Sequence, residues 1–163
     1  MLIDIHAHLD MLEDTPEIVL QKAKAAGVGK IITIGTEPAD FNFVLEVSSR
    51  LYPDVYCTLG IHPHHGSGWS EEAGQFIEQH LPEKNVVAVG EIGLDYHYNQ
   101  SPMEEQKLAL RRQLDIAAKF KMPVQIHTRD ADEDTALILA EYKGQVSGVI
   151  HCFTSSETLA KQC

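Results

Sequence analysis

Two histidines near the start of the chain, His6 and His8, have a spacing that could support chemistry on a β-strand. In a strand that begins at Leu2, alternate side chains point to opposite faces, so both imidazoles lie on one face at the carboxyl end. Neutral imidazole is a common ligand for divalent transition metals, and two of them supply half of a tetrahedral site. The same spacing also fits an edge strand with a solvated polar face. The pair therefore indicates a metal site only if other strands end in similar residues.

Several later strands are predicted to end in this way. Glu91 ends the apolar stretch 85–91, and a carboxylate there could bridge two cations, because each of its oxygens can bind one. Taken singly, Glu91 could instead be a capping acid at a strand–helix loop, and a histidine at a strand end could be a hydrogen-bonded core residue. No further carboxylate ligand is evident among the remaining residues. Together, the strand ends predict a site for two divalent ions with five candidate ligands: His6, His8, Glu91, His127 and His151.

Three further residues are placed to contact a substrate. His62 continues the inward-facing parity of a predicted strand at 55–60, and His64 lies on the loop that follows. Arg129 lies just beyond the end of another strand, where its guanidinium could bind phosphate or pair with a neighbouring aspartate. We expect the catalytic residues to be Glu91, His62 and Arg129. We expect the substrate-binding residues to be His62, His64 and Arg129.

Strand and helix signals alternate along the chain. Helix signals include the stretch Ser101-Pro102-Met103-Glu104, which has the S-x-x-E pattern of a capping box. Such alternation is typical of parallel strands joined by right-handed crossovers, and hence of an α/β fold. Apolar stretches predict the strands at residues 2–6, 30–34, 55–60, 85–91, 123–127 and 148–151.

The candidate ligands favour one of two α/β architectures. In an open sheet neighbouring strands are about 4.8 Å apart, so the ends of the first and sixth strands would lie too far apart to share a site. In a TIM-type (β/α)8 barrel, the carboxyl ends of all strands meet at one mouth, where such enzymes have their active sites. We therefore expect this barrel, with only about six β/α units present, because a complete barrel usually needs at least about 200 residues. An incomplete barrel exposes two strand edges, which predicts self-association.

The composition fits one domain that spans residues 1–163. The net charge of −11 excludes a broad basic surface for duplex DNA, so bound cations would have to attract an anionic substrate locally. No stretch approaches the roughly 18 apolar residues of a membrane span, and no secretory signal is visible. The 3 cysteines lack a C-x-x-C spacing and fit free thiols in a reducing compartment. We therefore expect a cytoplasmic protein with no membrane partner.

Five stretches together resemble the TatD family of metal-dependent hydrolases, within the wider amidohydrolase-like barrels. The Gly-Glu-Ile-Gly-Leu-Asp run and the His-Cys-Phe ending are the most specific of them. In the family's order, the matching stretches are Ile3-Asp4-Ile5-His6-Ala7-His8-Leu9-Asp10, Gly60-Ile61-His62-Pro63-His64, Gly90-Glu91-Ile92-Gly93-Leu94-Asp95, Gln125-Ile126-His127-Thr128-Arg129-Asp130-Ala131 and His151-Cys152-Phe153-Thr154.

The resemblance implies a TIM barrel that binds two divalent ions, Mg²⁺, Mn²⁺ or Zn²⁺. It implies that His62 and Arg129 approach the scissile phosphate. The family pattern also has a Ser/Thr-Asp-Ala-Pro motif on the last strand, whose aspartate binds the first metal, and these 163 residues do not contain it. The implied ligands are His6, His8 and Glu91 for the first ion, and Glu91, His127 and His151 for the second.

Many members of this family are described as deoxyribonucleases that act at DNA ends. We therefore expect a divalent-metal-dependent hydrolase that cleaves phosphodiester bonds, a 3'-5' exonuclease-like deoxyribonuclease acting on DNA ends or single strands. One alternative is a small-molecule amidohydrolase or phosphoesterase, which a panel of phosphate esters and cyclic amides would reveal. Another is an inactive truncated fragment, which would bind metal without hydrolysing any substrate.

Overall fold

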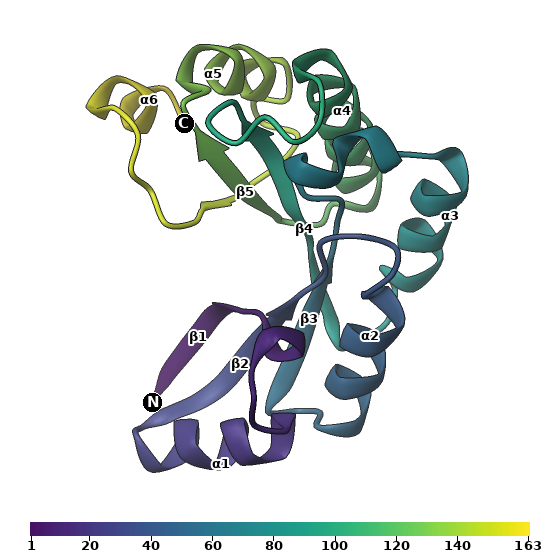
Figure 1. The fold of residues 1–163 in the computed structure, drawn as a ribbon, viewed down its shortest axis with the longest axis vertical. Coiled ribbons are helices and arrows are strands. Elements are labelled where there is room, and N and C mark those ends of the chain that lie inside the picture. The colour runs from purple at the N-terminus through teal and green to yellow at the C-terminus, as the bar shows by residue number, and fades with distance from the viewer.

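The computed structural model describes residues 1–163 and contains one parallel sheet of six strands, which lie side by side in chain order. Each crossover contains a helix, and the helices cover the outer face of a strongly curled sheet (Figure 1). This arrangement confirms the predicted TIM-type barrel with six β/α units. The strands are β1 (Leu2–Ala7), β2 (Val28–Ile34), β3 (Val55–Leu59), β4 (Val86–Asp95), β5 (Val124–Arg129) and β6 (Gly148–Ile150).

The capping box predicted at Ser101-Pro102-Met103-Glu104 does not form. Both hydrogen bonds of the Ser101 hydroxyl go to the loop after β3, and none goes to the first turn of the following helix. The hydroxyl donates to the carbonyl of His64 at 2.9 Å and accepts from the N–H of Ser67 at 3.1 Å. Ser101 thus ties the loop after β3 to the start of that helix. The helices are α1 (Pro16–Ala25), α2 (Phe41–Arg50), α3 (Glu71–His80), α4 (Met103–Phe120), α5 (Asp132–Glu141) and α6 (Glu157–Gln162), with short 3-10 segments η1 (Leu9–Met11) and η2 (Pro63–Gly68).

The apolar core lies between the outer face of the sheet and the helices that cover it. Ile92 and Leu94 of β4 and Leu110 and Leu114 of α4 are fully buried members of one large cluster. Because side chains alternate along a strand, Glu91 and Asp95, which flank these two residues of β4, point to the concave side of the sheet. The same packing that holds the helices therefore turns the polar residues of β4 inward.

Two fully buried glutamines of α4 hold the ends of two strands in place. The amide of Gln113 accepts from the N–H of Ile61 at 2.6 Å and donates to its carbonyl at 3.1 Å. Seven residues earlier, Gln106 makes the same pair of bonds with the backbone of Asp95, at 2.8 and 3.0 Å. Residues seven apart lie on one face of a helix. One face of α4 therefore positions both the start of the loop after β3 and the end of β4.

β4 runs to Asp95, beyond the end predicted at Glu91. Gly93 permits this extension, because β5 passes so close that a Cβ atom here would lie 1.9 Å from the carbonyl oxygen of His127. Its φ of +147° also favours glycine. In the parallel register, Gly93 lies beside His127 and Asp95 lies beside Arg129. The close approach places two carboxylates of β4 next to the polar end of β5.

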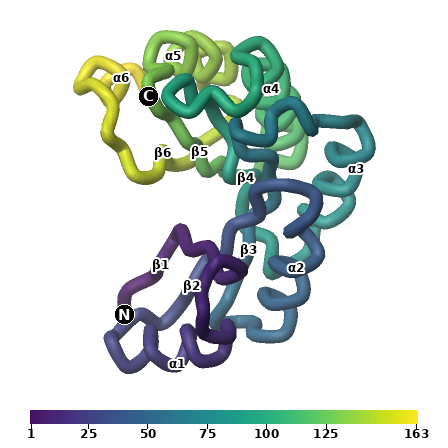
Figure 2. Tube along the Cα trace, viewed as in Figure 1, coloured from purple at the N-terminus to yellow at the C-terminus, as the bar shows by residue number.

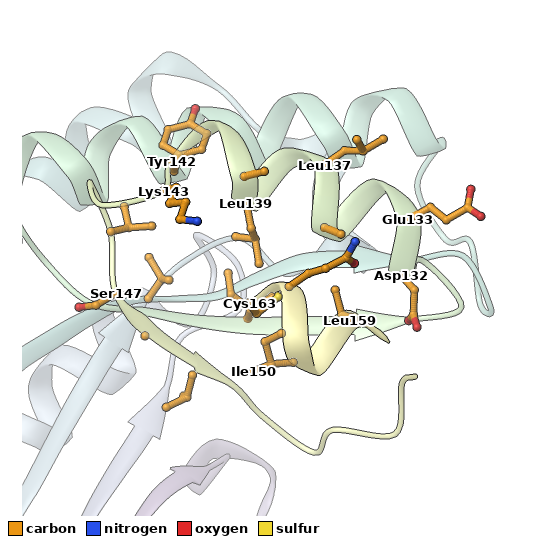
Figure 3. A pocket seen from close by; sticks show the side chains of 18 of the residues that line it. Asp132, Glu133, Leu137, Leu139, Tyr142, Lys143, Ser147, Ile150, Leu159 and Cys163 are labelled. Atoms are coloured by element: carbon orange, nitrogen blue, oxygen red, sulfur yellow. The ribbon is translucent and has the colours of Figure 1, made fainter. Parts of the chain in front are cut away.

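The sheet is open between its first and last strands, which do not pair with each other (Figure 2). Apolar side chains on these edges are exposed, including Leu2 at 66% and Val149 at 41%. A cavity of about 1050 Å³ lies between α5, α6 and the last strand, with Leu139, Ile150 and Leu159 in its lining (Figure 3). Further β/α units of a complete barrel would cover such surfaces. None of the helices combines the length and the apolar composition that a membrane-spanning segment requires.

Candidate metal centre

Glu91 lies at the middle of a cluster of imidazoles at the carboxyl ends of the strands. The residue is 2% exposed, and its two oxygens face different histidines. Oε2 lies 3.5 Å from His6 Nε2 and 3.9 Å from His8 Nε2, and these two nitrogens are 3.2 Å apart. A tetrahedral zinc ion with bonds near 2.1 Å holds its ligand atoms about 3.4 Å from one another. The three atoms therefore have the spacing of one side of a metal site.

A neighbouring amide fixes the orientation of His6. The Nδ1 atom of His6 lies 3.0 Å from the Oε1 atom of Gln125, and Gln125 Nε2 donates to the carbonyl of Ile5 at 2.6 Å. The second bond identifies which end of the amide is the oxygen, so Nδ1 of His6 is the protonated nitrogen. In neutral His6, Nε2 then carries a lone pair and faces a carboxylate oxygen, which is also an acceptor. A cation between the two atoms would make this contact favourable, so the donor set fits a bound metal.

The other oxygen of Glu91 faces a second group of imidazoles. Oε1 lies 3.1 Å from Nδ1 of His127 and 3.6 Å from Nε2 of His62, and it is hydrogen-bonded to Nε2 of His151. The stacked rings of His6 and His151, 3.8 Å apart, connect this group to the first. The two oxygens of Glu91 therefore face two separate groups of imidazoles, as a carboxylate that bridges two ions requires.

Asp95 is a second buried carboxylate of the site, which the sequence reasoning missed. It is 0% exposed, and its Oδ2 atom lies 3.0 Å from Nε2 of His127 and 3.0 Å from Nε2 of His64. His127 is thus held between two carboxylates, one on each ring nitrogen. Hydrogen bonding of this kind orients a metal ligand and strengthens its basicity. The signal was present in the sequence, because Asp95 has the same strand parity as Glu91.

Burial and charge act against each other in this cluster. Burial disfavours the charged form of Glu91, but hydrogen bonds with His127, His151 and His6 outweigh it and hold the pKa of Glu91 below its usual range. Burial also opposes protonation of His6 and His127, yet the adjacent Glu91 outweighs it and raises the pKa of both. Protons therefore balance the buried carboxylate wherever a metal ion does not.

In two other histidines, burial favours the neutral form. Burial lowers the pKa of His62 to about 3, and it also lowers the pKa of His8. A neutral imidazole keeps a free lone pair, which is the form that binds metals. The Nδ1 atom of His8 is buried without a hydrogen-bond partner, so nothing in these residues orients this ring as Gln125 orients His6.

Most of the predicted site residues lie around Glu91, but two of the predicted substrate contacts lie elsewhere. His62 faces Glu91 directly, so it lies among the candidate ligands, and its contact with substrate stays a prediction. His64 faces Asp95 rather than Glu91. Arg129 is exposed, and its guanidinium carbon lies 4.8 Å from the centre of the Tyr98 ring. The five predicted ligands all lie within one cluster around Glu91, and their roles as ligands stay a prediction.

Comparison with protein families identifies relatives along nearly the whole chain. Residues 3–163 match the family described as TatD related DNase. The chain is 38% identical to the uncharacterized metal-dependent hydrolase YabD of Bacillus subtilis, over 100% of this chain and 65% of that protein. It is 37% identical to a 3'-5' ssDNA/RNA exonuclease TatD of Klebsiella pneumoniae, over 89% of this chain and 55% of that protein. The chain thus spans less than two thirds of these relatives.

Solved structures show the same similarity. YJJV, a TatD homolog from Escherichia coli, is 35% identical with a TM-score of 0.89, covering 99% of this chain and 63% of that chain. A hydrolase TatD family protein from Entamoeba histolytica is 26% identical with a TM-score of 0.81, covering 99% of this chain and 61% of that chain. Nearly the whole chain therefore has the fold of a little under two thirds of each of these larger structures.

We predict that the substitution Gln125→Met weakens zinc binding by roughly 10–100-fold, because His6 loses the amide that orients it. Isothermal titration with Zn²⁺ measures the affinity. The matched control is Gln145→Met, because the Gln145 amide bonds only to the carbonyl of Glu141 at the surface. Equal zinc affinity in Gln125→Met and the wild type would show that the amide does not support a ligand.

Proposed function

The chain belongs to the TatD related DNase family, and on this premise we propose that residues 1–163 form one metal-dependent hydrolase domain that cleaves phosphodiester bonds. The observation that carries the proposal is the position of Glu91, whose two oxygens face separate groups of histidines. Such an arrangement suits two cations that share one carboxylate. The relatives are named as a metal-dependent hydrolase and as exonucleases, which supports the same reading.

The ligands we propose follow the two sides of Glu91. The first ion would be held by His6, His8 and Glu91, whose ligand atoms lie within 4.8 Å of one another. The second would be held by Glu91, His127 and His151, of which His151 is hydrogen-bonded to Glu91 Oε1. On that side the ligand atoms of His62, Glu91 and His127 also lie within 4.8 Å of one another, so His62 is a further candidate for the second ion. Imidazole and carboxylate together accept Zn²⁺ or Mn²⁺, and phosphate chemistry also commonly uses Mg²⁺. Divalent ions bound there would lower the pKa of a water molecule toward 7 and neutralise charge on the phosphate.

The side chains around this centre have distinct roles in the proposed reaction. Asp95 keeps the ring of His127 oriented through its 3.0 Å contact. Burial lowers the pKa of His62 to about 3, which favours the neutral imidazole, a form that can bind a metal or accept a hydrogen bond. Arg129 would bind a phosphate oxygen through its guanidinium fork. His64 contacts the same aspartate and meets the ring of Tyr98 at its edge, and it would be a further substrate contact.

We propose single-stranded DNA or frayed DNA ends as the substrate, with removal of nucleotides in the 3'-5' direction. Several relatives are named 3'-5' ssDNA/RNA exonucleases, which supports this choice. The net charge of −11 disfavours contact along a duplex, whereas a strand end needs only local attraction at the site. The cytoplasmic location stays a prediction that rests on the free cysteines.

We predict that Glu91→Gln lowers hydrolysis of a short single-stranded oligonucleotide by at least roughly 100-fold, because the amide cannot bridge two cations. Nucleotide release with added Mn²⁺ or Mg²⁺, resolved by gel, gives the rate. The control is Glu141→Gln, which removes only a surface pair with Arg111. If Glu91→Gln cleaves the oligonucleotide as fast as the wild type, Glu91 has no part in the reaction.

We also propose that the open edges of the sheet associate with a second copy of this chain. Unpaired backbone groups of an edge strand bind other strands, and the exposed apolar side chains Leu2, Ile3 and Val149 flank both edges. The acidic surface elsewhere on the molecule opposes association at other places.

Sedimentation velocity tests this interface. We predict that the wild-type chain sediments as species larger than the 18.1 kDa monomer. The double substitution Ile3→Lys and Val149→Lys should shift it to the monomer, whereas Leu108→Lys on the exposed face of α4 should not. A wild-type chain that sediments as a single 18.1 kDa species would contradict the proposal.

A further inference from the structure

Tyr98 is an exposed aromatic side chain that lies beside the candidate metal centre. It follows the end of β4, and 54% of its surface is exposed. Its backbone N–H donates to Oδ1 of Asp95 at 2.8 Å, while Oδ2 of the same carboxylate lies 3.0 Å from His127 Nε2. One buried carboxylate therefore fixes the position of Tyr98 relative to a candidate metal ligand.

Arg129 places a positive charge on this ring. Its guanidinium carbon lies 4.8 Å from the centre of the Tyr98 ring, and it forms no ion pair. The neighbouring aspartates that could have paired with it have other partners: Asp130 contacts His97 at 3.1 Å, and Asp132 bonds to Ser156. In a chain with 24 acidic residues against 13 basic ones, this guanidinium is available to an anion.

Two neighbouring histidines contact the Tyr98 ring at its edges and leave it without a stacked aromatic partner. His97 and His64 meet it at interplanar angles of 90° and 87°, with ring centres 4.8 and 5.5 Å away. These are edge contacts, and no ring of the protein stacks parallel to Tyr98. The ring is therefore restrained, and it still has exposed surface for a flat ligand.

We propose that Tyr98 and Arg129 form a nucleobase subsite, in which Tyr98 stacks on the base next to the scissile bond and Arg129 binds a phosphate of the same strand. The inference rests on the proposed function, since it takes a nucleic acid as the ligand. Aromatic stacking accepts any base, because every base has a flat π-face. A base can reach Tyr98 only when it is unpaired, so this subsite selects single strands and frayed ends over duplex interior.

Binding of a fluorescent oligonucleotide tests the subsite. The probe is a short single strand with hydrolysis-resistant phosphorothioate linkages and 2-aminopurine at each of the three 3'-terminal positions in turn. We expect the wild type to quench one of these positions, and Tyr98→Phe to quench it as well. Tyr98→Leu should lose the quenching and bind roughly 5- to 150-fold more weakly, which is the effect expected for loss of one stacked base.

A matched control is available at the opposite end of the sheet. Tyr52 is also exposed, at 37%, and also has a cation over its ring, with Lys84 Nζ 4.3 Å from the ring centre. It precedes β3, whereas Tyr98 follows β4, so the two lie at opposite ends of the strands. Tyr52→Leu should bind the probe like the wild type. Equal losses in Tyr52→Leu and Tyr98→Leu would overturn the proposal.

An oligonucleotide that lacks one base distinguishes a loss of stacking from misfolding of the variant. We expect an abasic residue at the quenched position to weaken binding to the wild type by the same 5- to 150-fold and to change binding to Tyr98→Leu less than twofold. Equal effects of the abasic residue on both proteins would overturn the subsite, as would a wild type that neither binds nor quenches the probe.

The nucleobase subsite and the proposed hydrolysis can be tested separately. Binding is read without turnover, in the presence of EDTA and again with Mn²⁺. Quenching that depends on Tyr98, in a protein without hydrolytic activity, would support the subsite and refute the proposed function. Hydrolysis that needs Glu91 but is unaffected by Tyr98→Leu, together with unchanged quenching, would do the reverse.

Discussion

The Glu91 carboxylate lies out of water with imidazoles on both of its oxygens, and an unbalanced charge in such a place would cost several kcal/mol. The histidines can balance it in two ways, by binding protons or by binding metal ions between their lone pairs and the carboxylate. At His6, Gln125 accepts the Nδ1–H and so directs Nε2 toward Glu91, where that nitrogen can bind either a second proton or a metal ion. Protons and metals therefore compete for the same positions, and metal affinity should fall as pH falls.

The rest of the fold serves to bring this carboxylate and its partners together. Curling of the sheet brings β1 to the fifth and sixth strands, as the bond from Gln125 to Ile5 and the stacked rings of His6 and His151 show. Gly93 lets β5 approach β4 closely enough for His127 to reach both carboxylates. The amides of α4 fix the backbone around them. Uncharged contacts with the backbone thus determine where the carboxylates and imidazoles of the site lie.

Much of this arrangement could be predicted from the sequence, because side chains on a strand alternate with a period of two and barrel strands end at one mouth. Glu91 and the histidines followed from that parity. Asp95 shares the strand parity of Glu91, but the prediction ended the strand at Glu91, and the close approach of β5 at Gly93 that accompanies its continuation is visible only in the structure. Gln125 was also missed, since a buried amide that orients a ligand has no sequence pattern of its own. Ser101 matched a capping pattern but had a stronger partner in the loop after β3.

The most direct test of the central claim is the electron paramagnetic resonance spectrum of the chain loaded with Mn²⁺. Two Mn²⁺ ions that share the Glu91 carboxylate would lie about 3.5–4 Å apart, as in two-metal sites generally. At that separation their spins couple, so we predict an exchange-coupled spectrum that disappears in Glu91→Gln. The six-line spectrum of isolated Mn²⁺ at all loadings, or no tightly bound Mn²⁺ at all, would contradict it.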